Sequence, residues 1–486
     1  MLEVEFAALL LKCQEEKCET RTLEVKSARK GCPEKLYDTF SSFSNQEDGG
    51  TILFGVDEQA GFQKVGVYDA HDLQKKLMEV GESMTPVVRP VLSVYEEDGL
   101  TFVAAEIPPV DIAERPCFKT AKGRLKGSYV RVGDADKPMT EYEIYSYEAY
   151  RKKSRDDIRP VEEAALSSLD PARLEQYIQR RKLDLPNFAA FPLPQLYELT
   201  GILREGKPTL SAFLLFCPYP QAYFPQLSII AARVPGREMG ELGTGGQRFT
   251  DSQRLEGSLP EMLNDAMGFL QKNMRTSIHI DPQTGKREDR TEYPADALRE
   301  VILNALVHRD YSAHTENMPI QVTMFSDRIE VRNPGGLYGR LTVDQLGKVQ
   351  PDTRNPFLVT AMEALGETEN RYSGIPRIRR AMQEADLPEP VFQDNRGEFM
   401  VCLYNRFEEN VPAERPDDPK GILAFCETPR NRQEIANFLG VSSVSYGMKK
   451  YIEPLVQSGQ ILLSIPDRPK SPEQTYRTAY IPDSHD

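Results

Sequence analysis

Two polar side chains, Glu300 and Asn304, interrupt an apolar segment that begins after Pro294. Residues four apart share one face of a helix, so both side chains would point in the same direction. Glycines follow at two later places, in Asn333-Pro334-Gly335-Gly336 and in Tyr372-Ser373-Gly374-Ile375. Oxygen ligands suit magnesium, and glycine lets backbone N–H groups approach a phosphate closely. These residue types are therefore ones that a metal and phosphate site can use.

A second group of candidate residues is acidic. Glu19, Glu24 and Asp57 could together hold a divalent metal, while Lys26 would stabilise the negative charge that develops in a reaction. Acids are common in this chain, at 74 of 486 residues, so their spacing alone is a weak indication. The alternative is that Glu24 and Lys26 form a structural ion pair and that Asp57 begins a turn.

Residues 115–137 are strongly basic in an otherwise acidic chain. Only Asp134 and Asp136 oppose the seven cations of this segment, which are Arg115, Lys119, Lys122, Arg124, Lys126, Arg131 and Lys137. Lys and Arg neutralise nucleic-acid phosphates and release counterions. We therefore expect a DNA-binding surface here, made by Lys119, Lys122, Arg124, Lys126 and Arg131. The alternative is a solvated hairpin without a partner.

The C-terminal part contains a third pattern. Residues 431–442 are typical of a helix that ends at a glycine turn and leads into a second helix. That second helix would place Lys449 and Lys450 against phosphates, beside four other polar positions: Ser442, Ser443, Ser445 and Tyr446. Strands near 460–463 and 476–480 would form a wing. The alternative to DNA binding is that this module contacts only protein.

Regular elements must position these residues. In the first part we expect strands over 20–26 and 51–56 with a helix over 33–44 between them, a hairpin of 92–95 with 102–107, and a charged helix over 141–155. In the later part we expect a strand over 227–234, helices over 259–274 and 294–307, and a tight hairpin of 320–325 with 328–332. The proline-rich segment 411–419 would be a linker.

The segment from Glu19 to Val56 resembles the start of the Schlafen/AlbA-like domain of bacterial predicted transcriptional regulators. Its motifs are Glu24-Val25-Lys26-Ser27, then Phe40-Ser41-Ser42-Phe43-Ser44-Asn45, then the strand that follows Gly49-Gly50. The similarity extends over residues 15–150. It implies an α/β domain that binds nucleic acid. Schlafen-type ribonucleases use three acids, which Glu19, Glu24 and Asp57 would supply here.

Residues 200–405 resemble the GHKL-type ATPases, through the order of the helix, the hairpin and the two glycine turns. Further matching motifs of a divergent branch are His308-Arg309-Asp310-Tyr311-Ser312 and Arg354-Asn355-Pro356. The resemblance implies an α/β sandwich that binds ATP and Mg²⁺. Glu300 would polarise water and Asn304 would hold the magnesium ion. The other nucleotide contacts would be Asn333, Gly335, Gly336, Ser373 and Gly374.

Two departures from that pattern weaken the expected activity. Asn333 replaces the Asp that grips adenine; an amide oxygen still accepts a hydrogen bond, but without charge. Tyr372 replaces the first glycine of the phosphate turn. We therefore expect weak nucleotide binding with little hydrolysis, and the alternative is a degenerate scaffold or dimerisation element. His308 is either a cation that complements the end of its helix or a phosphate contact.

Composition limits the class of protein. Hydrophobic residues make up 40% and charged residues 28% of the chain, as in ordinary globular proteins, and the net charge of −14 argues against indiscriminate nucleic-acid binding. The seven cysteines are scattered without a CxxC pair, which predicts free thiols in a reducing cytosol. No apolar run reaches the length of a membrane span and the start lacks a secretion signal, so we expect a cytoplasmic protein without a membrane partner.

We therefore expect an α+β multidomain protein. It would contain an AlbA-like α/β domain at 1–150, a linker and middle region at 160–290, a divergent GHKL-like α/β sandwich at 291–410, and a winged helix-turn-helix at 420–486. The favoured function is a DNA-binding transcriptional regulator, gated by a nucleotide and acting as a homo-oligomer, most simply a dimer. The alternatives are a metal-dependent nuclease, an ATPase acting on nucleic acid in defence or repair, and an interaction scaffold, because the fold alone does not decide the function.

Overall fold

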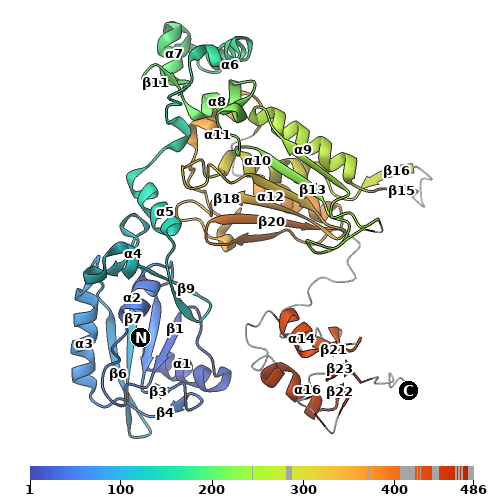
Figure 1. The fold of residues 1–486 in the computed structure, drawn as a ribbon. Coiled ribbons are helices and arrows are strands. Elements are labelled where there is room, and N and C mark those ends of the chain that lie inside the picture. The colour runs from blue at the N-terminus through green and yellow to red at the C-terminus, as the bar shows by residue number, and fades with distance from the viewer. Residues whose placement is uncertain are drawn as a thin grey trace. The chain divides into compact units, whose positions relative to one another are not determined.

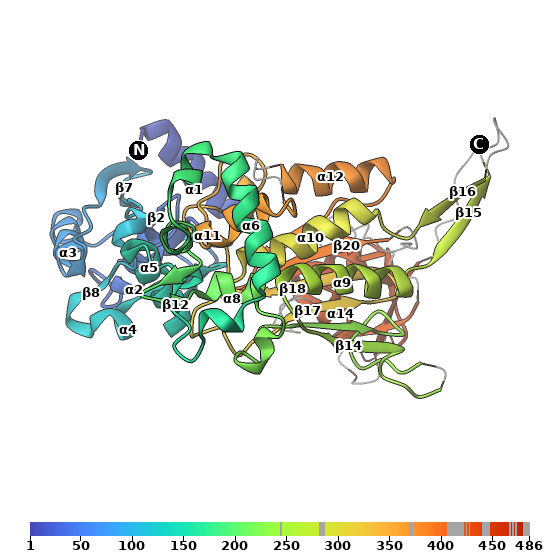
Figure 2. The same cartoon turned by 90° about the horizontal axis from the view of Figure 1, so that it is seen from above.

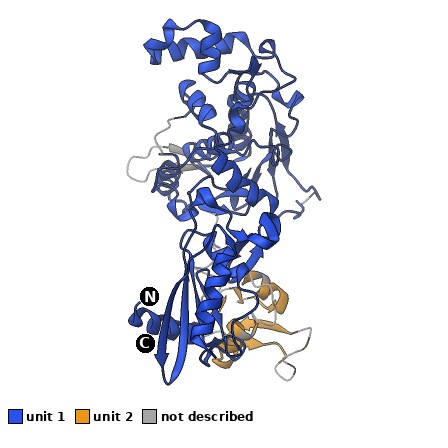
Figure 3. Ribbon diagram, turned by 90° about the vertical axis from the view of Figure 1, so that its left-hand side faces the viewer, with its two compact units in different colours: residues 1–405 blue, residues 406–486 orange. Residues whose placement is uncertain are grey.

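The computed structural model describes residues 1–243, 245–280, 287–368 and 373–405, and these parts of the C-terminal segment: 422–423, 425–426, 428–439, 448–465, 468, 471 and 474–479. The chain divides into two compact units, residues 1–405 and residues 406–486 (Figure 3). None of the helices within the described ranges combines the length and the apolar character that a bilayer crossing requires.

The first unit begins with a four-stranded sheet in the order β1-β2-β7-β6 (Figure 1). Strands β1 (Leu23–Lys26) and β2 (Gly50–Phe54) are parallel, whereas β7 (Leu100–Ile107) runs antiparallel to β2 and to β6 (Val91–Glu97). Parallel neighbours need a crossover connection, and α2 (Tyr37–Ser44) lies in that connection. The predicted order of strand, helix and strand is confirmed.

Helices cover both faces of this sheet because successive residues of a strand point to opposite sides. Phe54 belongs to a cluster with Phe43 of α2 and Leu77 of α3 (Ala70–Glu82). Leu53 belongs to a second cluster with Phe6 of α1 (Glu3–Glu16). The shorter elements of this region are β3 (Val56–Asp57), β4 (Gln63–Lys64), β5 (Met84–Thr85), β8 (Phe118–Lys119), α4 (Gly123–Gly127), β9 (Tyr129–Val132) and β10 (Ala135–Pro138).

The charged helix predicted after this region is α5 (Glu141–Lys152). Its first turn is fixed by a capping box, in which Thr140 and Glu143 satisfy each other's backbone N–H groups. Lys153 ends the helix in the left-handed conformation, with φ 50°. The helix therefore begins and ends at positions that its own sequence specifies.

A second, six-stranded sheet has the order β14-β13-β17-β18-β20-β19. Its members are β13 (Ile229–Arg233), β14 (Asp251–Leu255), β17 (Ile320–Met324), β18 (Arg328–Pro334), β19 (Val391–Asp394) and β20 (Glu398–Tyr404). Strands β13 and β17 are parallel and the other neighbours are antiparallel. The predicted hairpin of β17 with β18 is confirmed. Strands β13 and β14 come from the segment predicted as a linker and middle region.

Helices α9 (Leu259–Asn273) and α10 (Ala295–His308) cover one face of this sheet (Figure 2). Helix α10 follows Pro294 and buries Leu298, Val301, Ile302 and Leu306 in the large core of the region. Glu300 and Asn304 lie on the same helix and are half-buried. Helix α12 (Gly374–Glu384) lies beside α10.

Other elements surround this sandwich. The apolar run 209–216 is buried and forms α8 (Leu210–Phe216). The hairpin of β15 (Thr276–Ile280) with β16 (Arg287–Thr291) is antiparallel, and residues 281–286 between its strands lie outside the described residues. The remaining elements are α6 (Pro171–Asp184), α7 (Leu193–Leu199), β11 (Leu203–Arg204), β12 (Lys207–Pro208) and α11 (Pro356–Ala364).

The second unit is described in part. Its elements are β21 (Arg430–Asn431), α14 (Arg432–Phe438), a single π-helical turn (Met448–Ile452), α16 (Glu453–Gln457), β22 (Ile461–Leu463) and β23 (Thr475–Thr478), with the strands in the order β21-β23-β22. Ile435, Ile452 and Tyr476 share its buried core. A helix and two strands therefore occur where they were predicted. Residues 440–447, which hold most of the predicted recognition helix, and the linker 411–419 lie outside the described residues, and the winged helix stays a prediction.

Candidate functional site

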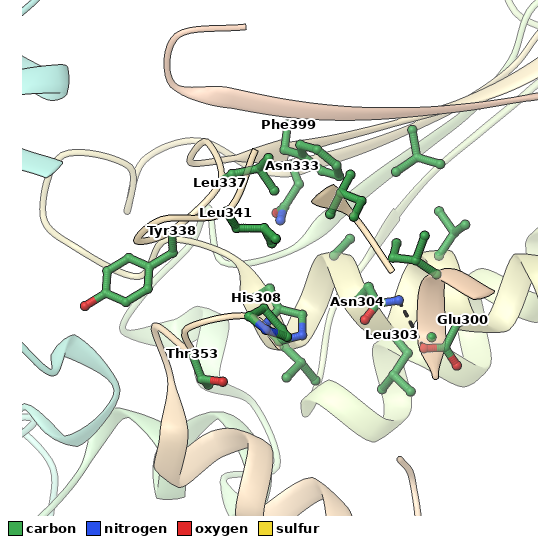
Figure 4. A pocket seen from close by; sticks show the side chains of 18 of the residues that line it. Glu300, Leu303, Asn304, His308, Asn333, Leu337, Tyr338, Leu341, Thr353 and Phe399 are labelled. Carbon is green, nitrogen blue, oxygen red and sulfur yellow. Dashed lines mark hydrogen bonds between the residues drawn. The ribbon is translucent and has the colours of Figure 1, made fainter. Parts of the chain in front are cut away.

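A pocket opens in the first unit between α10, the end of β18 and the start of α12 (Figure 4). Its cavity volume is about 190 Å³. Figure 4 shows the Glu300–Asn304 pair and Asn333 on different sides of this cavity. Between these polar groups the walls are apolar and are formed by Leu303, Leu337, Leu341, Leu346, Ile378 and Phe399. The structure thus brings together the residues that were predicted from three separate segments.

The helix pair Glu300 and Asn304 is preorganised. The amide Nδ2 of Asn304 donates a hydrogen bond of 3.0 Å to Glu300 Oε1, which leaves the amide oxygen of Asn304 directed elsewhere (Figure 4). Burial raises the pKa of Glu300 above its ordinary value, although the bond from Asn304 and the charge of Arg377 oppose that shift. Asn304 can therefore offer a neutral oxygen ligand while Glu300 remains a weak base.

The first residue of α12 lies directly against this pair. A Cβ atom at Gly374 would clash with Glu300 Oε1 and would lie 3.2 Å from Asn304 Nδ2, so a larger residue there would displace the Glu300–Asn304 pair. Ser373 precedes it and also lines the pocket. The free N–H groups of a helix N-terminus favour an anion. Tyr372, the predicted departure in this turn, lies outside the described residues.

Asn333 supplies a polar atom that has no partner. Its side chain is 6% exposed, and the buried Oδ1 accepts no hydrogen bond. Leaving such an acceptor unsatisfied costs free energy, typically about 1–3 kcal/mol. Asn333 lines the pocket but its Oδ1 is buried, so a donor group on a ligand would satisfy this atom once the amide turned towards the cavity. This is the described feature of the pocket that points most directly to a bound molecule.

The two glycines after Asn333 allow the chain to turn in a crowded place. Gly335 has φ +100°, and a Cβ atom there would lie 2.5 Å from Asp310 Cβ and 2.6 Å from Arg354 Nη1. A Cβ atom at Gly336 would lie 2.6 Å from Asp394 Oδ1. Gly335 is therefore required by its backbone conformation and by the atoms around it, which is a structural reason for the motif in addition to any ligand; at Gly336 the Asp394 side chain would have to move.

His308 lines the pocket, and part of its surface is exposed. The protein atoms around its ring, helped by the charge of Arg354, lower the pKa of its imidazole to about 4. The imidazole is therefore neutral at ordinary pH. The interpretation of His308 as a cation that complements the end of α10 does not agree with this environment.

The acidic group of the N-terminal region forms an ion network instead of an open ligand set. Glu24 pairs with Lys26 and lies 2.8 Å from Arg131 Nη1, while Glu19 lies 3.8 Å from each of these two cations. The Arg131 side chain is 1% exposed and also contacts Asp136 at 3.0 Å. Burial raises the pKa of Glu19 to about 7.

The third predicted acid, Asp57, is not part of this network. Its Oδ1 accepts a hydrogen bond of 3.1 Å from the backbone N–H of Gln59, as at the start of a turn. Within the described ranges, no group of three or more His, Cys, Asp or Glu side chains is arranged to hold a metal ion. The arrangement agrees with the alternative of an ion pair and a turn. Metal binding by Glu19, Glu24 and Asp57 therefore stays a prediction without structural support.

The basic segment 115–137 divides into surface and interior positions. Lys119 and Lys122 lie over the ring of Tyr37, with their Nζ atoms 4.5 Å and 4.3 Å from its centroid, and Lys126 is exposed. Arg124 forms an ion pair with Glu148 of α5. Arg131 is buried in the network described above, so its predicted contact with DNA does not agree with its position.

The C-terminal candidates are only partly placed. Lys450 is exposed and its Nζ lies 4.9 Å from the ring centroid of Tyr451. The backbone of Lys449 belongs to the π-helical turn, but its side chain lies outside what the structure describes. Ser442, Ser443, Ser445 and Tyr446 lie outside the described residues. Their predicted contacts with DNA stay predictions.

Three residues around the pocket were missed as contributors to it: Asp310, Arg354 and Tyr142. Asp310 and Arg354 had been noted only as parts of motifs, without a role, and Tyr142 only as part of a charged helix. Arg354 Nη1 lies 2.8 Å from Asp310 Oδ2, and the hydroxyl of Tyr142 donates to the same oxygen at 2.6 Å. For Asp310 and Arg354 a signal was present in the sequence: an acid and a base lie in the two motifs on either side of the glycine turn, His308–Ser312 and Arg354–Pro356.

We predict that Glu24 has a structural role that Asp57 does not share. Glu24→Gln should lower the free energy of unfolding by on the order of 3 kcal/mol, because it removes a carboxylate from a buried arginine. Asp57→Asn is the matched control and should change it by less than about 0.5 kcal/mol. Thermal melts of both variants test this. If manganese raised the melting temperature of the wild type and both substitutions removed that rise, the acids would be metal ligands instead.

Comparisons with known protein families match three separate segments of the chain. Residues 19–140 match the family described as "Schlafen, AlbA_2", residues 317–403 match "Putative ATP-dependent DNA helicase recG C-terminal", and residues 420–479 match "Filamentation induced by cAMP protein Fic-like, C-terminal domain". No curated protein matches this sequence.

Two solved structures show a more distant likeness. The DIP2311 protein from Corynebacterium diphtheriae is 18% identical, with 94% of this chain and 92% of that chain covered and a TM-score of 0.39. The N-terminal domain of a RecG-related protein from Nitrosomonas europaea is 26% identical, with 27% of this chain and 91% of that chain covered and a TM-score of 0.22. Neither superposition is close enough to carry an argument. The family matches show that this α+β chain combines a Schlafen AlbA_2 domain with an ATPase-like domain of the RecG C-terminal type.

Proposed function

We propose that this protein is a DNA-binding transcriptional regulator whose ATPase-like domain binds magnesium–ATP with little hydrolysis. The observation that carries the nucleotide part of the proposal is the unsatisfied Oδ1 of Asn333 in an apolar pocket. The AlbA_2 and RecG-type matches support a function associated with nucleic acid. Regulation of transcription, and action as a homodimer, are the further steps of this proposal.

The Asn333 side of the pocket suits a purine base. The amino group of adenine is a donor and would satisfy the Oδ1 atom that otherwise lacks a partner. Leu337 and Phe399 line the same region and would pack against the faces of the ring. A neutral imidazole at His308 adds a further group that can donate or accept a hydrogen bond without a charge.

The opposite side of the pocket suits a phosphate and its magnesium ion. The N-terminus of α12 begins at Gly374, and the amide oxygen of Asn304 is a possible metal ligand. Magnesium would neutralise the phosphate charge there. These residues fit a phosphate with its magnesium ion. Asn304 offers an oxygen ligand, and α12, a helix of 11 residues, offers the N–H groups of its N-terminus.

Little turnover is expected from the surroundings of Glu300. A general base must reach a water molecule that can attack the last phosphate. Glu300 Oε1 already accepts the hydrogen bond from Asn304, and the backbone of Gly374 packs against it. Binding that persists without rapid hydrolysis is suited to a regulatory ligand.

The proposed DNA-binding surface is the basic surface of the AlbA_2 domain, formed by Lys119, Lys122, Arg124 and Lys126. Two of these side chains, Lys119 and Lys122, lie over the ring of Tyr37, which orders them against one aromatic support. Lys449 and Lys450 would add a second contact from the C-terminal unit. The nuclease alternative has less support, because Glu19 and Glu24 are engaged by Lys26 and Arg131.

We predict that Mg–ATP raises the melting temperature of the wild-type chain, because a ligand that binds only the folded state stabilises it by mass action. Asn304→Ala should abolish this shift by removing the magnesium ligand. Glu300→Gln is the matched control on the same helix face and should keep the shift. Differential scanning calorimetry at millimolar Mg–ATP makes the measurement. Equal shifts for all three proteins would show that Asn304 is not the ligand.

We predict that DNA affinity depends on the basic surface and falls steeply with salt. Lys122→Ala with Lys126→Ala should weaken binding to every DNA sequence. The slope of log affinity against log salt concentration should become shallower by up to about two, because up to two phosphate contacts are lost. Lys12→Ala with Lys75→Ala removes the same charge from α1 and α3 and should have little effect. Fluorescence anisotropy over a salt series measures both. A larger loss in the second pair would place the surface elsewhere on the domain.

A further inference from the structure

The turn that carries Asn333 is held from behind by a buried ion pair. Asp310 and Arg354 are 3% and 8% exposed, and they enclose Gly335 so closely that a Cβ atom has no room. Asp310 N donates to Pro334 O at 3.0 Å, and Arg354 Nη2 donates to Gly336 O at 3.1 Å. The position of the Asn333 turn therefore depends on where Asp310 and Arg354 lie.

Helix α5 supplies the third member of this group. The hydroxyl of Tyr142 donates a hydrogen bond of 2.6 Å to Asp310 Oδ2, the oxygen that also faces Arg354. Burial alone would raise the pKa of Asp310, but Arg354 and the hydrogen bonds from Tyr142 and Ser312 keep it below its ordinary value. Asp310 is therefore a carboxylate whose position is fixed from two sides.

The ring of Tyr142 makes a second contact, with Gly397, which is itself hydrogen-bonded to the Asn333 turn. A Cβ atom at Gly397 would lie 3.0 Å from this ring, and Gly397 O accepts a hydrogen bond of 2.8 Å from Gly335 N. The neighbouring Glu143 accepts two hydrogen bonds of 2.7 Å from Arg396. The start of α5 is thus bound to the turn between β19 and β20, and that turn is bonded to Gly335, which directly follows β18.

The far part of α5 continues these contacts. Tyr150 donates to Asp352 Oδ2 at 3.1 Å, and its ring lies 5.5 Å from the ring of Tyr338. Asp352 and Tyr338 both line the pocket. Between these positions, Glu148 pairs with Arg124 of the basic surface. One helix therefore contacts the wall of the pocket and a residue proposed to bind DNA.

We propose that Tyr142 is a positioning residue of the nucleotide site, which acts through Asp310 and Arg354 on the turn of Asn333. This inference rests on the proposed nucleotide binding. It adds that the site is incomplete without α5, a helix outside the residues that match the ATPase-like family. Tyr142 does not touch the ligand; its hydroxyl fixes the ion pair that sets the distance between the Asn333 turn and the opposite wall.

The test compares two tyrosine hydroxyls in the full-length chain. Tyr142→Phe keeps the ring against Gly397 and removes only the bond to Asp310. Tyr95→Phe is the matched control, because its hydroxyl also donates at 2.6 Å, to Met1 O in the AlbA_2 domain. Glu143→Gln is a second variant that loosens the start of α5 without altering Asp310. Isothermal titration with Mg–ATP gives the affinity, and melting without nucleotide gives the stability.

We expect Tyr142→Phe to weaken Mg–ATP binding by about five- to tenfold, the order of one typical intramolecular hydrogen bond. Glu143→Gln should weaken it to a lesser extent, and Tyr95→Phe should leave it unchanged even if its melting temperature falls. Unchanged affinity in Tyr142→Phe, or an equal loss in Tyr95→Phe, would overturn the inference while nucleotide binding stands. No heat of binding in the wild type would contradict both the inference and the proposed nucleotide site.

Discussion

The geometry of the pocket depends on one buried ion pair, Asp310 with Arg354. Two opposite charges taken out of water are tolerated only when their remaining hydrogen-bonding groups also find partners. Asp310 finds them in Tyr142 and in the backbone of Ser312, and Arg354 donates to Gly336 O. The pair therefore contributes more to the definition of one conformation than to net stability. Everything that the Asn333 turn offers to a ligand follows from this arrangement.

A similar network in the N-terminal region has the opposite consequence. Glu19, Glu24, Lys26 and Arg131 neutralise one another within the domain, so their charges are engaged by internal partners. Around the pocket, by contrast, the acceptor of Asn333 that lacks a partner belongs to a residue that lines a cavity. The difference lies in whether the buried polar groups are next to a space that a ligand could fill. A closed set of ion pairs supports the fold, whereas an open acceptor in an apolar cavity indicates a place for a ligand.

Much of the fold could be predicted from the sequence because it depends on local patterns. The strands and helices follow apolar periodicity, and Glu300 with Asn304 could be placed on one face by their spacing alone. Asn333 was recognised as a candidate site residue by its motif, Asn333-Pro334-Gly335-Gly336. The six-stranded sheet was harder, because β13 pairs with β17 across a long insertion that includes α9 and α10. Pairing between distant strands leaves no local signal.

The charged residues were predicted less well, for a related reason. The sequence gives the number of cations in 115–137, but the direction in which each side chain points depends on partners elsewhere in the chain. Arg131 points inward to Glu24, and Arg124 points to Glu148 on α5. The contact of Tyr142 with Asp310 joins residues 168 positions apart. Sequence shows how many charges a segment has, whereas only the fold shows which of them remain available to a phosphate.

The central claim is that one chain binds a nucleotide and nucleic acid and couples the two. The most direct measurement is the Kd of the full-length protein for one DNA duplex, at fixed salt and magnesium, with and without saturating ATP. Coupling between two sites is reciprocal and typically changes affinity by about fivefold or more. The account predicts such a change in the Kd for DNA, and the same factor when the Kd for ATP is measured with and without DNA. Identical values under all of these conditions, in a protein that binds both ligands, would contradict it.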